Sequence, residues 1–109
     1  MKIVFDDIKE SVADNFKGGE KSFASRAFSD EKNKMMKGRL VPGASIGLHR
    51  HEGNCEMIYV LEGCGKMIYD GGVERLSAGD LHYCPEDHEH SFINDGDCDL
   101  VFIAVVPAQ

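Results

Sequence analysis

Short runs of alternating or fully apolar residues, separated by turns that contain glycine, dominate the chain after residue 36. Strands are expected at 37–41, 45–51, 55–61, 64–69, 73–76, 81–84, 90–93 and 99–106. Short strands with turns about every 8–12 residues, and without helical crossovers between them, indicate an antiparallel sandwich or barrel. The pattern therefore predicts an all-β fold.

Two of these segments, 55–61 and 99–106, are apolar on both faces of the expected strand. A strand at the surface of a small barrel is normally polar on its outer face, so something is expected to cover these outer faces. Either the N-terminal arm or a second subunit could cover these faces. A homodimer is the preferred interpretation.

Residues 1–36 have a weaker pattern. Lys21–Phe28 is compatible with a strand, and Ser29–Met36 with a short helix or a loop, because Ser29 is a plausible N-cap. We expect a short N-terminal arm that includes at most one short helix.

Length, charge and composition limit the classes of protein that fit. The 109 residues suffice for one compact domain, expected at 1–109. The net charge of −7, from 12 basic and 19 acidic residues, argues against nucleic acid and anionic membranes as partners. No apolar run is long enough for a membrane span or a signal peptide, so a cytoplasmic location is expected. Four scattered cysteines then predict free thiols.

The chemistry of the chain centres on His49 and His51. Because side chains along a strand alternate between faces, both imidazoles lie on one face. Glu56 has the wrong parity for the same strand, but a turn at Gly53-Asn54 would let it open the adjacent antiparallel partner strand and point back inward. Two imidazoles and a carboxylate suit Mn, Fe, Ni or Zn ions and leave coordination positions open. A surface histidine pair without function is the alternative.

Three more histidines, His82, His88 and His90, lie around Pro85. His90 is a natural fourth ligand that arrives from a distant strand. His82, between Leu81 and Tyr83, is interpreted as structural. For His88, an exposed position in a turn is favoured over a role in the mouth of the barrel.

Two spaced motifs resemble those of the cupin superfamily. In 43–63, Gly43, His49, His51, Glu56 and Gly63 match every fixed position of the first cupin motif. In 79–94, the second motif is matched by Gly79, Pro85, His90 and Asn94, with Asp87 in place of the usual glycine. Asp tolerates a left-handed backbone better than most residues, so the turn is expected to survive.

The resemblance implies a double-stranded β-helix, or jelly-roll barrel, with one divalent metal ion held by His49, His51, Glu56 and His90. It also agrees with a homodimer, and it is nearest to small bacterial cupins described as oxalate-decarboxylase-like. The expected function is a metal-dependent enzyme acting on a small oxygen-rich metabolite, of dioxygenase, decarboxylase or isomerase type. A small-molecule binding or sensing cupin without turnover is the alternative, because fold does not select the reaction.

Overall fold

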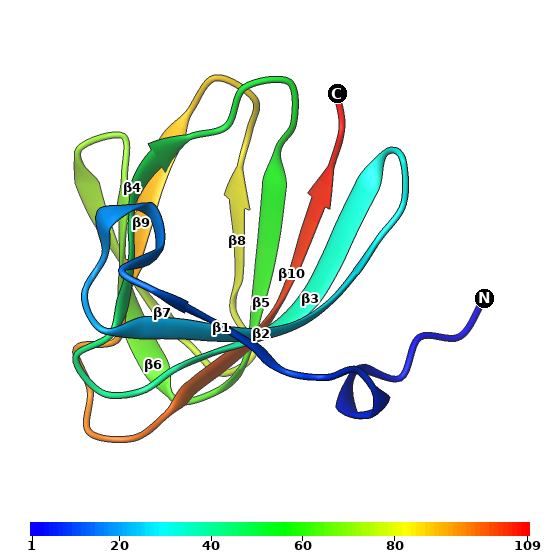
Figure 1. Cartoon of the computed structure of the whole chain (residues 1–109). Helices are drawn as coiled ribbons and strands as arrows, with labels where there is room; N and C mark the ends of the chain where they lie inside the picture. The colour runs from blue at the N-terminus through cyan, green and yellow to red at the C-terminus, as the bar shows by residue number, and fades with distance from the viewer.

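Ten strands in two antiparallel sheets make up most of the chain, which the computed structural model describes from residue 1 to residue 109 (Figure 1). The larger sheet has the order β1 (Ser11–Asp14), β2 (Ser22–Ser29), β3 (Asn33–Leu40), β10 (Leu100–Pro107), β5 (Glu56–Glu62) and β8 (Leu81–Cys84). The smaller sheet has the order β4 (Ser45–Arg50), β9 (Glu89–Ile93), β6 (Cys64–Tyr69) and β7 (Gly72–Ser77). The helical elements are two short 3-10 turns, η1 (Phe5–Asp7) and η2 (Phe16–Gly18). Neither could span a membrane.

From β3 onward the chain passes repeatedly between the two sheets. β4, β6, β7 and β9 belong to the smaller sheet, while β5, β8 and β10 belong to the larger one. Apart from the hairpin of β6 and β7, strands that follow one another in sequence therefore lie in opposite sheets, as in a jelly roll (Figure 1). The predicted all-β jelly-roll fold is confirmed, and every strand expected after residue 36 is present.

The N-terminal region differs from the prediction at Ser29–Met36. The expected strand at Lys21–Phe28 corresponds to β2, but the helix or loop expected after it is wrong, because the chain turns back at once into β3. Asp30 makes this turn, since its side chain accepts hydrogen bonds from the backbone N–H groups of Lys32 (3.0 Å) and Asn33 (2.8 Å). β2 and β3 thus form a hairpin that extends the larger sheet.

The two sheets enclose one apolar core. Along β5, Ile58 and Val60 are buried, and along β10, Phe102 and Ala104 are buried. Glu56 lies two residues before Ile58, so the same alternation directs its side chain into the interior. The core consists of Phe23, Met36, Leu40, Ala44, Ile46, Ile58, Val60, Met67, Leu76, Phe92, Leu100, Phe102 and Ala104.

The outer face of β5 and β8 carries large apolar side chains in the isolated chain. Tyr59, Leu81 and Tyr83 are 44%, 64% and 52% exposed. Tyr59 and Leu81 are direct cross-strand partners, so these side chains form one patch.

β1 and β2 lie at the opposite edge of the same sheet, beyond β3 and β10. The N-terminal residues contact the outer side of β2 and β3, where Asp6 pairs with Lys37 and Glu10 with Arg39, and β1 extends the sheet at that edge. They do not cover the patch on β5 and β8.

Two glycines allow η2 to lie directly against β4. A Cβ atom added to Gly47 would lie 1.9 Å from the carbonyl oxygen of Lys17. One added to Gly19 would lie 2.1 Å from the carbonyl oxygen of Ser45. Both distances are far below van der Waals contact and involve backbone atoms, so only glycine fits. This contact fixes the position of Lys17 relative to β4.

Replacing Gly47 by alanine is expected to destabilise the chain, because η2 or β4 must move to accept the methyl group. The cost of such overpacking is roughly 1–3 kcal/mol. For a domain of this size, each kcal/mol corresponds to a melting temperature lower by about 4–8 °C. The matched control is Gly72→Ala, whose added Cβ would meet only the Tyr69 carbonyl oxygen at 3.4 Å. Equal melting temperatures for the two variants would contradict the packing described here.

Candidate metal centre

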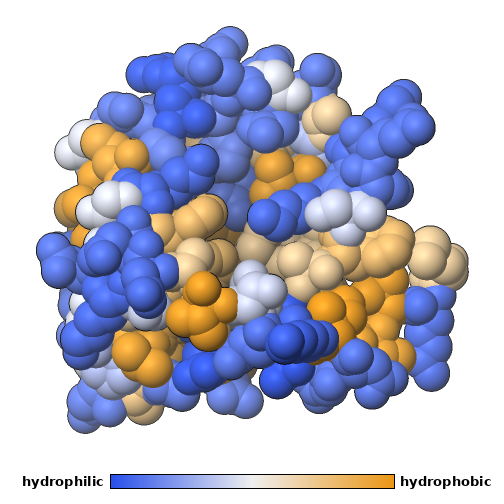
Figure 2. Space-filling view, viewed as in Figure 1, coloured by the Kyte–Doolittle hydropathy of each residue, from blue (hydrophilic) through white to orange (hydrophobic).

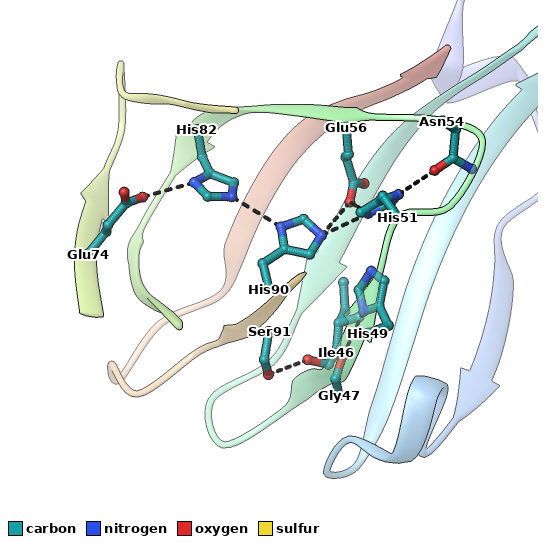
Figure 3. Close-up of polar contacts among 10 residues, drawn as sticks. All are labelled: Ile46, Gly47, His49, His51, Asn54, Glu56, Glu74, His82, His90 and Ser91. Atoms are coloured by element: carbon teal, nitrogen blue, oxygen red, sulfur yellow. Dashed lines mark hydrogen bonds and ion pairs between the residues drawn. The ribbon is translucent and has the colours of Figure 1, made fainter. Parts of the chain in front are cut away.

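Strands of both sheets bring the four predicted ligands together (Figure 3). His49 on β4 is the direct cross-strand partner of His90 on β9. His51 comes immediately after β4, where its N–H donates to the His88 carbonyl oxygen at 3.0 Å. Glu56 is the first residue of β5. All four residues therefore stand at one end of the barrel, near the β4–β5 and β8–β9 connections (Figure 1).

The turn between β4 and β5 makes this arrangement possible. Gly53 has a φ of +75°, a left-handed conformation that glycine adopts without strain. The reversal lets Glu56 face the histidines from the opposite sheet. The antiparallel pairing expected between the two strands is wrong, because β4 pairs with β9 while β5 pairs with β10 and β8. Asn54, in the same turn, directs its side-chain oxygen to Nδ1 of His51 at 2.7 Å.

The four side chains converge closely enough to share one ion. Nε2 of His90 lies 2.9 Å from Oε1 of Glu56, and Nε2 of His51 lies 3.1 Å from the same oxygen. The two Nε2 atoms are 3.0 Å apart. The ring of His49 completes the group, with its centroid 4.8 Å from that of His90. One ligand atom from each of the four residues lies within 4.8 Å of the others.

Outer hydrogen bonds fix how two of the histidines present their nitrogens. Nδ1 of His49 donates to the Gly47 carbonyl oxygen at 2.7 Å, and Nδ1 of His51 donates to the Asn54 side-chain oxygen. A neutral imidazole that donates through Nδ1 has a lone pair at Nε2. Both rings are thereby oriented as metal ligands normally are, with the remote nitrogen held by an outer acceptor.

Electrostatics keep Glu56 ionised although it is only 9% exposed. Burial alone would raise its pKa, but hydrogen bonds from His51 and His90 outweigh burial and lower the pKa to about 2. The hydrogen bond to Glu56 in turn raises the pKa of His51. Burial lowers the pKa of His49, which favours its neutral form.

This donor set fits a divalent cation. A buried carboxylate and converging imidazole nitrogens need a positive charge between them, which either a proton on His51 or a metal ion can provide. Mixed nitrogen and oxygen ligands are those that Mn, Fe, Ni and Zn ions accept. The group can therefore hold a metal ion, and its chemistry does not select which one.

A cavity of about 400 Å³ opens beside these residues and carries several positive charges. His49, His51 and Glu56 are among its lining residues. In the view of Figure 2, hydrophilic residues cover most of the upper part of the molecule, and apolar residues form a band across the middle. The cations that line the cavity are Lys17, Lys34 and Arg50, and its remaining lining residues are Phe16, Met36, Glu52, Asn54 and Val106.

The other residues singled out from the sequence have separate positions. His88 lies in the β8–β9 connection and does not line the cavity, but it is half-buried and not fully exposed, with its ring stacked on Tyr69 and Nδ1 2.5 Å from Oδ2 of Asp70. Asp87 has a φ of +70° and does take the left-handed conformation. Tyr59 lies on the outer face, opposite Glu56, as its parity predicted. All four cysteines are free thiols, as expected.

Sequence reasoning missed the connection between His82 and the centre. Nε2 of His82 lies 3.0 Å from Nδ1 of His90, and its own Nδ1 lies 2.9 Å from Oε1 of Glu74. The available signal was parity: His82 and Cys84 share one face of β8, and the apolar Leu81 and Tyr83 share the other. His82, Cys84 and His90 form a second buried group with metal-ligating atoms.

Known proteins share both this fold and part of this sequence. A curated oxalate-binding protein of Thermotoga maritima is 41% identical over 68 residues, which span 62% of this chain and only 56% of that relative. The crystal structure of a predicted oxalate decarboxylase from Thermotoga maritima has a TM-score of 0.94 and 30% identity, with both chains covered completely. A sugar phosphate isomerase of the cupin superfamily from Silicibacter pomeroyi has a TM-score of 0.82 at 22% identity. The match covers 100% of this chain and 76% of that one, and this likeness concerns the fold alone.

The family comparison agrees with the two spaced motifs and with the jelly-roll topology. The family model described as a cupin domain matches residues 36–106, well over half of the chain. That range contains all four converging residues. This chain belongs to the cupin family.

Proposed function

We propose that residues 1–109 act as one cupin domain that holds a single divalent metal ion through His49, His51, Glu56 and His90. The function of this ion is to bind a small oxygen-rich anion, with oxalate as the first candidate. The observation that carries the proposal is the convergence of Glu56 with Nε2 of His51 and of His90 at 2.9–3.1 Å in a buried position. A buried carboxylate with two imidazole nitrogens at these distances needs a positive charge among them, and a divalent ion would supply it.

Cations around the cavity support an anionic ligand. The chain as a whole carries a net charge of −7, yet Lys17, Lys34 and Arg50 all line the cavity beside the four residues. Ammonium and guanidinium groups attract carboxylates and donate hydrogen bonds to their oxygens. When bound, the metal ion would supply Lewis acidity and coordination positions for ligand oxygens. Oxalate has two carboxylates, so it can use both kinds of partner.

Turnover is a second candidate, favoured by the likeness to the predicted oxalate decarboxylase of Thermotoga maritima. Glu52 is the one carboxylic acid that lines the cavity without belonging to the converging group, so it is the candidate proton donor or acceptor. Carbon dioxide release from oxalate, measured with metal-loaded protein, separates decarboxylation from binding alone. Oxygen consumption with catechols and keto acids, and isomerisation of sugar phosphates, test the other reaction types.

We also propose that two copies of the chain pair through the outer face of β5 and β8. The patch formed by Tyr59, Leu81 and Tyr83 is exposed in one copy. Burying exposed apolar area contributes about 25 cal/mol per Å², and a twofold interface lets one patch cover its own copy. A second subunit would thus supply the cover that the N-terminal residues do not.

Metal analysis tests the proposed ligands directly. Protein purified without a histidine tag is expected to contain one divalent ion per chain, measured by plasma mass spectrometry. His49→Ala removes a ligand while leaving the buried Glu56 pairings in place, and it is expected to reduce the metal content strongly. His88→Ala is the control, since His88 lies at the surface outside the converging group. Unchanged metal content in His49→Ala would contradict the assignment.

Oxalate binding to metal-loaded protein is expected to weaken when the cavity cations are removed. Lys17→Ala and Lys34→Ala should each raise the oxalate Kd by roughly fivefold, the equivalent of about 1 kcal/mol for one partly exposed charge contact. Isothermal titration calorimetry measures this. Lys9→Ala, an exposed residue outside the cavity, should bind oxalate like the unaltered chain. Equal Kd values for all three variants would exclude the lysines from ligand binding.

Sedimentation velocity tests the pairing of two chains. The unaltered protein is expected to sediment as a dimer, and Leu81→Glu as a monomer, because a charge would be placed in the middle of an apolar interface. Val73→Glu is a matched control, since Val73 and Leu81 are both 64% exposed but Val73 lies on β7 of the other sheet. A monomeric unaltered protein, or a dimeric Leu81→Glu variant, would show that this face is not the interface.

A further inference from the structure

A row of side chains connects the molecular surface to His90 (Figure 3). Oε1 of Glu74 on β7 lies 2.9 Å from Nδ1 of His82 on β8. Nε2 of His82 lies 3.0 Å from Nδ1 of His90 on β9. The side chain of Glu74 is 45% exposed, whereas His82 and His90 are each 2% exposed. The row therefore runs from solvent to the interior of the barrel in two hydrogen bonds.

The carboxylate at the outer end determines where each hydrogen in the row lies. A carboxylate only accepts hydrogen bonds, so Nδ1 of His82 must carry the hydrogen that faces Glu74. Because the ring is buried, the neutral form is the less costly one, and it has a lone pair at Nε2. This lone pair must accept from Nδ1 of His90. Without a metal ion, a hydrogen on Nε2 of His90 supplies the contact with Glu56; with an ion bound, Nε2 would instead carry a lone pair on the side of Glu56 and His51.

The support of His90 differs in kind from that of the other two histidines. Gly47 and Asn54 offer oxygen atoms, which can only accept, so His49 and His51 are oriented by their direct partners alone. The partner of His90 is another imidazole, which can either donate or accept. Only the contact with Glu74 decides the direction of that hydrogen bond.

We propose that Glu74 and His82 are positioning residues that hold His90 in the tautomer able to bind a metal ion. An exposed carboxylate on an edge strand thereby controls the affinity of a buried site. This inference rests on the metal site proposed above. Outer partners of metal-binding histidines typically contribute roughly 10–100-fold to metal affinity, by fixing ring orientation and raising ligand basicity.

His82 and His90 also belong to a second group of metal-ligating side chains. His82, Cys84 and His90 could together bind a second ion, since their ligand atoms lie within 4.8 Å of one another. That ion would need a lone pair at Nδ1 of His90, which the hydrogen bond to His82 excludes. Burial, together with the charge of Glu56, raises the pKa of the Cys84 thiol to about 12, which opposes the thiolate that a metal requires.

Zinc titration of the metal-stripped, untagged chain tests the proposal. Glu74→Gln and His82→Leu are each expected to bind one zinc ion roughly 10–100-fold more weakly than the unaltered chain. His82→Gln should recover much of the affinity, because an amide can accept from His90 and donate to Glu74 at the same time. Glu62→Gln is the control, since Glu62 is an exposed acid on β5 outside both histidine groups. Glu74→Gln alters a surface side chain, so it tests the proposal even if His82→Leu does not fold.

Nitrogen-15 NMR of the histidine rings supplies a readout that simple loss of stability would not change. In the unaltered chain, His82 is expected to be protonated at Nδ1 and unprotonated at Nε2. In Glu74→Gln, His82 is expected to show a mixture of both tautomers. Protonation of Nε2 of His82 in the unaltered chain would overturn the proposal. So would unchanged zinc affinity in both Glu74→Gln and His82→Leu, or a second zinc ion that is lost in Cys84→Ser. If the unaltered chain binds no zinc, manganese, iron or nickel ion at all, the metal site itself is wrong.

Discussion

The buried carboxylate of Glu56 is the constraint on which the rest of the site depends. Removing an ionised carboxylate from water costs several kcal/mol unless charges or hydrogen bonds compensate for it. Here the compensation comes from His51 and His90, at 3.1 and 2.9 Å. The strands that carry these histidines must therefore be held in a fixed relation to β5. The pairing of β4 with β9, and the turn at Gly53, provide that relation.

In a small barrel, the alternation of side chains along each strand determines which residues face the interior. On β5, Glu56 shares the inner face with Ile58 and Val60, so a charged group enters the same interior as the core. The charge stands at the end of the strand, beside a cavity that leads to solvent. The apolar core below gives the site a rigid base, and the cavity leaves it accessible. Binding sites in barrels commonly occupy such a mouth.

Much of this arrangement was predictable from the sequence, and the exceptions have physical reasons. The period of two placed His49 and His51 on one face, and the glycine turn explained how Glu56 joins them. The hairpin after Ser29 was missed because Asp30 creates it through two side-chain hydrogen bonds, a local preference that hydrophobic pattern does not express. The contact of His82 with His90 depends on how β8 lies across from β9, in the other sheet. Strand parity directs His82 into the interior, but it does not predict which residue of the facing sheet His82 contacts.

Gly47 serves two neighbours at once. Its missing side chain makes room for the backbone of η2, and its carbonyl oxygen accepts the hydrogen bond from His49. A shift of this one peptide would therefore disturb a cavity lysine and a proposed metal ligand together. In an alignment of relatives, Gly19 and Gly47 should vary as a pair: lineages that lose one should lose the other, and should carry a differently built loop where Lys17 stands. The two glycines would thus mark which relatives keep the same cavity wall.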